Sequence, residues 1–278
     1  MTKYNLTVAY RIYPKVSKVP PLFKDDKYKL SEFCIESFKR ALGNLKVKII
    51  VLFDNCPLEY ENLFKNQFDK EDLEFIHLEG VGNQATFKLQ IETLLSQNYS
   101  ELVYFAEDDY FYMPNAFEEM MEIIKNDDVD FISPYDHLDY YNYIMHNHKV
   151  LIKATDKRHW KTSTSTCLTF LTDKKTLLKS RRTFESYTKG NWDSSLWLAL
   201  SKEGLWNPFR VLTSLLRGEK LFAAIILMAW RYCWLQILFG RVYKLWTPIP
   251  TLGIHLESDY LPPTEKCLDY MLKKVKQS

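Results

Sequence analysis

The sequence is poor in the residues and segments that mark several classes of protein. Only 8 of its 278 residues are glycine, and its 5 cysteines are scattered without a CxxC pair. Neither a disulfide framework nor a zinc knuckle is therefore expected, and a reducing compartment is the simplest interpretation. The opening residues, MTKYNLTVAY, lack a basic stretch followed by an apolar one. We therefore expect no signal peptide and a protein that stays in the cytoplasm.

A surplus of charge of one sign is also missing. Lys and Arg number 37 against 35 for Asp and Glu, so no nucleic-acid partner is expected, because such proteins normally carry a clear basic excess. Hydrophobic residues make up 46% and charged residues 26%, which excludes a disordered or collagen-like chain. Aromatic residues reach 15%, enough for a large core and for flat faces that bind a ligand or a membrane interface.

Apolar runs and amphipathic stretches alternate along the first 200 residues. We expect strands at 6–13, 47–53, 73–78, 101–106 and 129–134, and helices at 29–42, 85–97 and 114–126. The runs 47–53 and 101–106 are continuously apolar, as is typical of strands covered on both faces. This alternation predicts an α/β sandwich with a mainly parallel central sheet.

The composition changes between residues 206 and 246. This segment holds four of the seven Trp and six basic residues against one acid, Glu219. Its apolar run 221–239 approaches transmembrane length, but Arg231 near the middle disfavours spanning. On one continuous helix the basic residues Arg210, Arg217, Lys220 and Arg231 form a stripe beside aromatic side chains, which is typical of a helix lying on an anionic membrane. The alternative is a cap packed on the sheet, with a helix break at Gly218.

Three consecutive acids, Glu107, Asp108 and Asp109, end the apolar run 101–106 in the sequence VYFAEDDYFYMP. The carboxyl end of a strand is where open α/β sheets bind ligands. Because three adjacent anions repel one another, a divalent cation with oxygen ligands, Mg²⁺ or Mn²⁺, is the expected counter-charge. The alternative is a solvated acidic turn.

The order of these features resembles the nucleotide-sugar half of family-2-like glycosyltransferases with the GT-A fold, a Rossmann-related three-layer sandwich. The resemblance covers roughly residues 4–205 and 252–263. It is carried by Asp54 after the second strand, the turn GVGNQATF (80–87) entering a helix, and the acids after the strand 101–106. It implies transfer of a sugar from a nucleotide diphosphate sugar to a hydroxyl acceptor.

The resemblance also implies roles for individual residues. Asp109 is expected as a direct metal ligand with Glu107 in the first position of the acidic motif, and His255 in LGIHLESDYLPP completes the metal or diphosphate site. For the nucleotide sugar we expect contacts from residues near the strand ends and from the helix after the turn. These residues are Tyr10, Arg11, Asp54, Lys88, Glu107 and Asp108.

The segment GNWDSSLWLALSKEGL (190–205) resembles the one that carries the catalytic base of inverting members of the family, which here is Asp193. The same residue also suits the N-cap of a helix. Trp192 and Trp160 are expected at the acceptor, because sugar rings stack on flat aromatic faces. His146 and His148 are not expected to form a metal site.

We therefore expect a catalytic domain over 1–205, a membrane-associating helical segment over 206–246, and a C-terminal segment, 247–278, that returns to the active site. The function expected is metal-dependent, inverting sugar transfer in cell-surface glycan assembly, on a glycan or lipid-linked acceptor at the inner face of the membrane. Two alternatives stay open. One is a non-catalytic, membrane-associated protein that binds glycan or nucleotide. The other is a sugar nucleotidyltransferase, although RIYPKVSKVPP (11–21) lacks the glycine-rich loop usual after its first strand.

Overall fold

The fold is that of a computed structural model, which describes residues 3–16, 19–207 and 209–276. The strands are β1 (Leu6–Ile12), β2 (Val47–Asp54), β3 (Leu73–Leu78), β4 (Leu102–Glu107), β5 (Tyr110–Tyr112), β6 (Phe131–Ile132), β7 (Ile152–Ala154), β8 (His159–Ser163), β9 (Phe170–Asp173), β10 (Leu245–Ile249) and β11 (Gly253–His255). The α-helices are α1 (Lys27–Ala41), α2 (Tyr60–Lys65), α3 (Asn83–Ser96), α4 (Ala116–Ile123), α5 (Asp139–Asn142), α6 (Lys174–Glu185), α7 (Asp193–Ser201), α8 (Phe209–Leu216), α9 (Lys220–Phe239) and α10 (Glu265–Val275). Short 3₁₀ turns are η1 (Lys70–Asp72), η2 (Ile144–His146), η3 (Ser186–Lys189) and η4 (Ser258–Tyr260).

Nine strands form the central sheet in the order β3-β2-β1-β4-β9-β6-β10-β8-β7. The half made of β3, β2, β1 and β4 is wholly parallel. In the other half β9 and β8 run against their neighbours, while β10 is parallel to β6. The predicted α/β fold with a mainly parallel central sheet is thus confirmed, with antiparallel strands added at one end.

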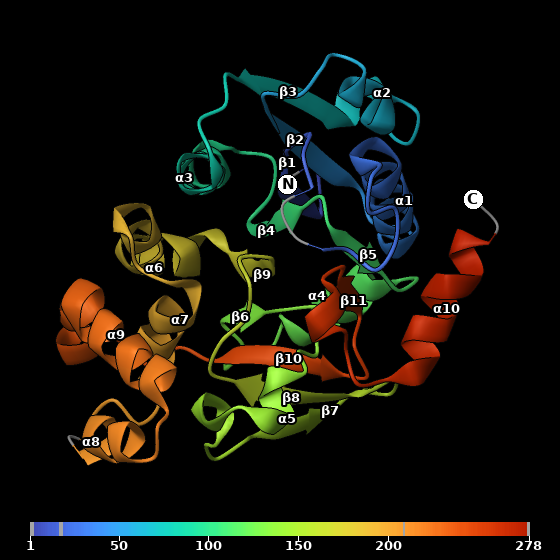
Figure 1. Ribbon diagram of the computed structural model, residues 1–278. Helices are drawn as coiled ribbons and strands as arrows, with labels where there is room; N and C mark the ends of the chain where they lie inside the picture. Colours follow the sequence, from blue (N-terminus) through green and yellow to red (C-terminus); the bar gives the residue numbers. More distant parts are fainter. Residues whose placement is uncertain (1–2, 17–18, 208, 277–278) are drawn as a thin grey trace.

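Helices cover both faces of the sheet, which makes three layers (Figure 1). One core cluster joins β1, β2 and β4 to α1, α2 and α4, and a second joins the opposite face to α3, α6 and α7. Along β1 the side chains alternate between them: Tyr10 enters the first cluster and Ala9 the second. Arg11 therefore points away from α1 and toward α3, and the strand register places it opposite Glu107 of β4.

A small second sheet ties the C-terminal part of the chain to the end of β4. In this sheet β11 pairs antiparallel with β5, with His255 opposite Tyr110. Because Tyr110 directly follows Asp109, the pairing carries His255 to the acidic run across 146 positions of sequence.

The helices α8 and α9 lie beyond α7 at the lower left of Figure 1, away from the sheet. Apolar residues of α9 form a third core cluster with Leu198 and Ala199 of α7. The two helices are separated at Gly218, whose φ of +79° lies in the left-handed region. The basic residues Arg210 and Arg231 therefore lie on two different helices and not on one continuous stripe.

Candidate functional site

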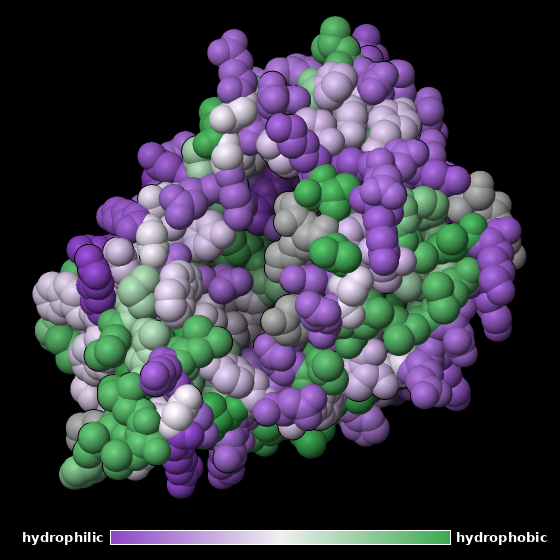
Figure 2. All heavy atoms as spheres, in the orientation of Figure 1, coloured by the Kyte–Doolittle hydropathy of each residue, from purple (hydrophilic) through white to green (hydrophobic). Residues whose placement is uncertain are grey.

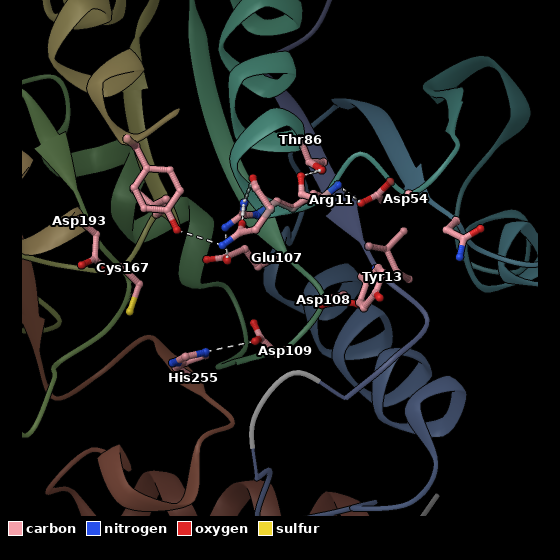
Figure 3. Close-up of a pocket in the computed structure, with 17 residues that line it drawn as sticks. Arg11, Tyr13, Asp54, Thr86, Glu107, Asp108, Asp109, Cys167, Asp193 and His255 are labelled. Carbon is pink, nitrogen blue, oxygen red and sulfur yellow. Dashed lines mark hydrogen bonds and ion pairs between the residues drawn. The ribbon is translucent and has the colours of Figure 1, made fainter. Parts of the chain in front are cut away.

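A cavity of about 640 Å³ lies at the carboxyl ends of β1, β2 and β4, where parallel sheets place their ligands. The recess near the centre of the face shown in Figure 2 is hydrophilic, and Figure 3 shows its lining at close range. Five elements outside these strands complete it: the turn into α3, the segment before β9, η3, the start of α7 and β11. Its lining includes the side chains of Arg11, Tyr13, Asp54, Asn83, Thr86, Glu107, Asp108, Asp109, Cys167, Tyr187, Asp193 and His255.

Each of the three consecutive acids has its own cationic partner in the protein. Glu107 accepts hydrogen bonds from the Arg11 guanidinium and from Thr169 Oγ1, the latter at 2.6 Å. Asp108 Oδ2 lies 2.8 Å from Lys27 Nζ and accepts from the Tyr13 backbone N–H at 3.1 Å. Asp109 Oδ2 lies 3.1 Å from His255 Nε2. Much of the repulsion expected from the sequence is therefore balanced by side chains.

The Asp109–His255 pair lines the cavity and is largely buried. Burial disfavours both charges, yet the Asp109 carboxylate raises the pKa of His255 well above its usual value. In turn, the imidazole holds the pKa of Asp109 below its usual range against the opposing effect of burial. Among the described residues, Asp109 Oδ1 has no hydrogen-bond partner although it is buried. This orphaned oxygen is the atom best placed to bind something that enters the cavity.

A divalent ion fits this pair better than it fits the whole acidic run. A carboxylate oxygen and an imidazole nitrogen are both ordinary ligands of Mn²⁺, and Mg²⁺ is commonly held by one or two carboxylates together with substrate phosphates. Glu107 is not available as expected, because Arg11 and Thr169 use both of its oxygens. The described residues contain no group of three or more His, Cys, Asp or Glu arranged to hold a metal.

Arg11 is the centre of a polar chain across the cavity floor. Its guanidinium donates to the side chain of Asn83 at the start of α3, as well as to Glu107. Asn83 Nδ2 in turn donates to the Tyr187 hydroxyl at 2.9 Å. This chain joins β4 to β1, α3 and η3, so Arg11 positions the walls of the cavity and is itself held in place.

Asp54 holds the turn that leads into α3. Its two carboxylate oxygens accept hydrogen bonds from the backbone N–H groups of Val81 and Gly82, at 2.8 and 2.9 Å. The side chain is 4% exposed, yet it lines the cavity beside Asn55. A carboxylate in this position fixes the shape of the nearby wall and keeps lone pairs toward the cavity.

Asp193 lies across the cavity from Asp54, with Arg11 and Glu107 between them in Figure 3. It is the first residue of α7 and not its N-cap, which is Trp192, and this corrects the expected capping role. An acid in the first helical turn is favoured by the helix dipole. Its neighbour Trp192 is 40% exposed and lies next to the cavity without lining it.

Three residues expected at the site lie elsewhere. Tyr10 is fully buried among Phe38 and Phe64 on the opposite face of β1, because neighbouring residues of a strand point to opposite faces. Trp160 is fully buried in the core, so it offers no face to an acceptor sugar. Lys88 is exposed on α3 beside Glu92 and does not line the cavity.

Lys27, Tyr187 and Cys167 were not expected at the site from the sequence, and Asn83 was covered only as part of the turn GVGNQATF (80–87). Lys27 comes from the start of α1, and Tyr187 from η3. None of them stands in a recognisable spacing with the residues it contacts, so only the folded chain brings them together. A buried lysine next to an acidic run is the one signal that charge balance would have suggested.

No protein-family model matches this sequence, and no curated protein does either. Among solved structures, the chain is similar to S. aureus TarS, with a TM-score of 0.41 and 11% identity over 66% of this chain and 33% of that one. It is also similar to the galactosyltransferase LgtC, solved in complex with donor and acceptor sugar analogues, with a TM-score of 0.41 and 8% identity over 69% of each chain. This chain thus spans about a third of the length of TarS. At these values neither likeness assigns a family or an activity to this chain.

Proposed function

We propose that this protein is a glycosyltransferase that moves a sugar from a nucleotide diphosphate sugar to a hydroxyl acceptor. The observation that carries the proposal is one cavity at the ends of parallel strands that is lined by three separate sets of polar residues. These are Asp54 at one side, the Asp109–His255 pair at the floor, and Asp193 at the other side. In this order, the three sets would contact the nucleoside, the diphosphate and the acceptor hydroxyl.

The charge of the cavity supports dependence on a divalent ion. Five carboxylates line it (Asp54, Glu107, Asp108, Asp109 and Asp193), whereas its lining cations are Arg11 and His255, with Lys27 behind Asp108. A diphosphate anion would be repelled by this excess unless a cation accompanied it. Asp109 Oδ1 would hold Mn²⁺ or Mg²⁺ there, joined by His255 Nε2 once the ion has displaced the proton that Nε2 shares with Asp109. When bound, the ion would stabilise the negative charge of the departing diphosphate.

The chain's own residues would carry out the remaining steps. The Asp193 carboxylate would take the proton of the acceptor hydroxyl as its oxygen attacks the anomeric carbon. The bond from that carbon to the diphosphate oxygen breaks, and its electron pair leaves with the diphosphate. Attack from the side opposite the leaving group would invert the anomeric centre. Asp54 would contact the nucleoside, and Trp192 would contact the acceptor.

The acceptor in this proposal is a glycan or a lipid-linked glycan, and the reaction serves the assembly of a cell-surface polysaccharide. The place of action would be the cytoplasmic face of the cell membrane. Support comes from the exposed apolar and basic side chains of α8 and α9.

A non-catalytic binding protein is the second candidate. It is favoured by one observation: the three acids already have Arg11, Lys27 and His255 as partners, which a purely structural cluster would also need. The two candidates differ in what Asp193→Asn should do. In an enzyme, this variant binds nucleotide with unchanged affinity but transfers sugar at least 100-fold more slowly. In a binding protein, the variant behaves like the wild type in every binding assay.

The experiment that tests the proposal is a thermal-shift panel of UDP, GDP, dTDP and CMP, each with and without Mn²⁺. A ligand at 100 times its dissociation constant stabilises the folded state by about 2.7 kcal/mol, which gives a clear shift. We expect one nucleotide to stabilise the wild type only with the ion, Asp109→Ala to lose that response, and the exposed Asp127→Ala to keep it. The absence of any nucleotide response in the wild type would refute sugar transfer.

A further inference from the structure

The helix α8 exposes most of its apolar residues, while Val211 is half-buried against the third core cluster and the polar Ser214 is buried. Phe209, Leu212 and Leu216, which share one side of the helix, are 69%, 53% and 79% exposed. The side chain that the helix buries is that of Ser214. Surface helices of soluble proteins show the reverse arrangement, because apolar side chains gain free energy by leaving water. Figure 2 shows this apolar area at the lower left, over α8.

The helix α9 adds a second apolar strip. Leu227 precedes a break in helical geometry at Cys233, and Trp234 and Leu238, four residues apart, follow it on one side of the helix; the three are 57%, 48% and 41% exposed. The opposite side of α9 packs on α7 through residues such as Phe222 and Ile226. By length and composition α9 is also apolar enough to cross a membrane. One side of α9, however, already packs against the rest of the protein, so the helix is suited to lie on a bilayer and not to cross it.

Basic residues accompany these apolar strips without matching acids. Arg217, Lys220 and Arg231 are exposed. The single acid between residues 206 and 246, Glu219, has its Oε2 buried. Cations beside apolar and Trp side chains complement an anionic headgroup layer over an acyl interior, whereas an apolar protein partner would leave the cations unpaired.

We propose that this surface, called here the α8–α9 face (Phe209, Leu212, Leu216, Leu227, Trp234 and Leu238, with the three exposed cations), docks on an anionic lipid bilayer. Docking follows from the surface alone and does not depend on the reaction. A consequence for the acceptor does rest on the proposed function, and it comes from how α9 holds the loop before Asp193.

The loop directly before Asp193 is anchored on the inner side of α9. Asn191 Nδ2 donates to Cys233 Sγ at 3.4 Å, directly before the exposed Trp234. The Asn191 side chain also accepts from the Trp192 backbone N–H at 2.9 Å. Packed helices lie about 10 Å apart, so the docking surface and the start of α7 are separated by roughly one helix. A lipid-linked acceptor would therefore reach Asp193 from the membrane on which the protein sits.

Vesicle flotation of the full chain tests the docking. The probes are vesicles of phosphatidylcholine alone and of phosphatidylcholine with 30% phosphatidylglycerol. We expect binding to the anionic vesicles, weakened by high salt, and little binding to the neutral ones. Arg217→Gln with Lys220→Gln should weaken the partition roughly 30-fold, and Leu212→Gln with Leu216→Gln should weaken it at least as much. The matched control, Leu178→Gln with Lys179→Gln on the exposed side of α6, should leave it unchanged.

Three results would overturn the inference. The wild type does not bind anionic vesicles, or the α8–α9 variants bind them as well as the control does. Alternatively, sedimentation velocity finds wild-type dimers that the same variants convert to monomers without vesicle binding, which would assign the face to a second copy. The nucleotide thermal-shift panel distinguishes the two proposals. If the protein floats with anionic vesicles but is stabilised by no nucleotide, the docking surface is supported and the transferase proposal is refuted.

Discussion

Glu107 shares its two carboxylate oxygens between Arg11 and Thr169, and the Arg11 and Glu107 side chains are only 10% and 19% exposed. Glu107→Gln keeps the size of the side chain but removes the charge that balances the guanidinium. Since a buried cation without its partner is costly, we expect the free energy of unfolding to fall by about 3 kcal/mol. Urea denaturation without any metal ion measures this.

The matched control for Glu107→Gln is the exposed Glu122→Gln, which should change the stability by less than about 0.5 kcal/mol. If Glu107→Gln unfolds like the wild type but binds Mn²⁺ more weakly, then Glu107 is a metal ligand, as the sequence predicted. The two interpretations of this residue are thus separated by whether its effect needs the ion.

Asp54 offers a second test at a single residue, because its two oxygens each hold one backbone N–H of the turn into α3. Asp54→Asn leaves one neutral acceptor, so one N–H loses its partner and the other keeps only an uncharged one. We expect a loss of about 2 kcal/mol in the free energy of unfolding and a weaker thermal shift with nucleotide. Asp127→Asn on the surface is the control, and equal behaviour of the two variants would show that the hydrogen bonds to the turn contribute little.

The sequence predicted the acids of the site better than their partners. Asp54, Glu107 and Asp109 could be identified because each follows an apolar strand, a relation that exists along the chain. Lys27 and Tyr187 approach them only through the packing of α1 and η3 against the sheet ends. Tyr10 was misplaced although β1 carries a usable pattern: large apolar residues alternate with Thr7, Ala9 and Arg11, which puts Tyr10 and Arg11 on opposite faces of the strand.

The turn between β3 and α3 shapes one wall of the cavity and depends on Gly82. Its φ of +83° and ψ of +170° belong to a region that only glycine adopts readily, although a Cβ there would meet no atom within 4 Å. Gly82→Ala should therefore cost about 2 kcal/mol of stability through backbone strain alone. Because the turn would shift to relieve that strain, we also expect the nucleotide thermal shift to shrink.

Gly218→Ala is the matched control for this turn. Gly218 also has a positive φ, of +79°, with open space around a Cβ, but it lies between α8 and α9. We expect it to lose about 1 kcal/mol of stability while its nucleotide response stays that of the wild type. An unchanged nucleotide response in Gly82→Ala would mean that the turn does not contact the donor.

Elements of the parallel half could be predicted from the sequence because each carries its own pattern. The expected strand 73–78 is β3, and the expected helix 85–97 is α3 (Asn83–Ser96) within two residues. The other half could not be predicted in the same way. β8 reads HWKTS and β7 only IKA, so their strand conformation follows from pairing with each other and with β10. Such long-range pairing leaves no local signal.

Across the whole molecule, stability in acid depends on a histidine far from the catalytic proposal. His146 is buried beside Tyr140, and its Nδ1 lies 3.0 Å from Thr164 Oγ1. Burial, reinforced by His137, His148 and Lys161, lowers its pKa from 6.5 to about 3. The folded protein thus keeps His146 neutral, whereas the unfolded chain takes up a proton below pH 6.5. The free energy of unfolding should therefore fall as the pH decreases from 6.5 toward 3.

The expected loss between pH 7 and pH 5 is about 2 kcal/mol from this one group. His146→Gln cannot bind the proton, so its stability relative to the wild type should improve by that amount between the two pH values, whatever it costs at pH 7. Urea denaturation of both proteins at each pH measures the difference, and other titrating groups cancel in it. The exposed His159→Gln should show no such change. Equal pH dependence in the wild type and His146→Gln would mean that the fold admits a charged imidazole at this position.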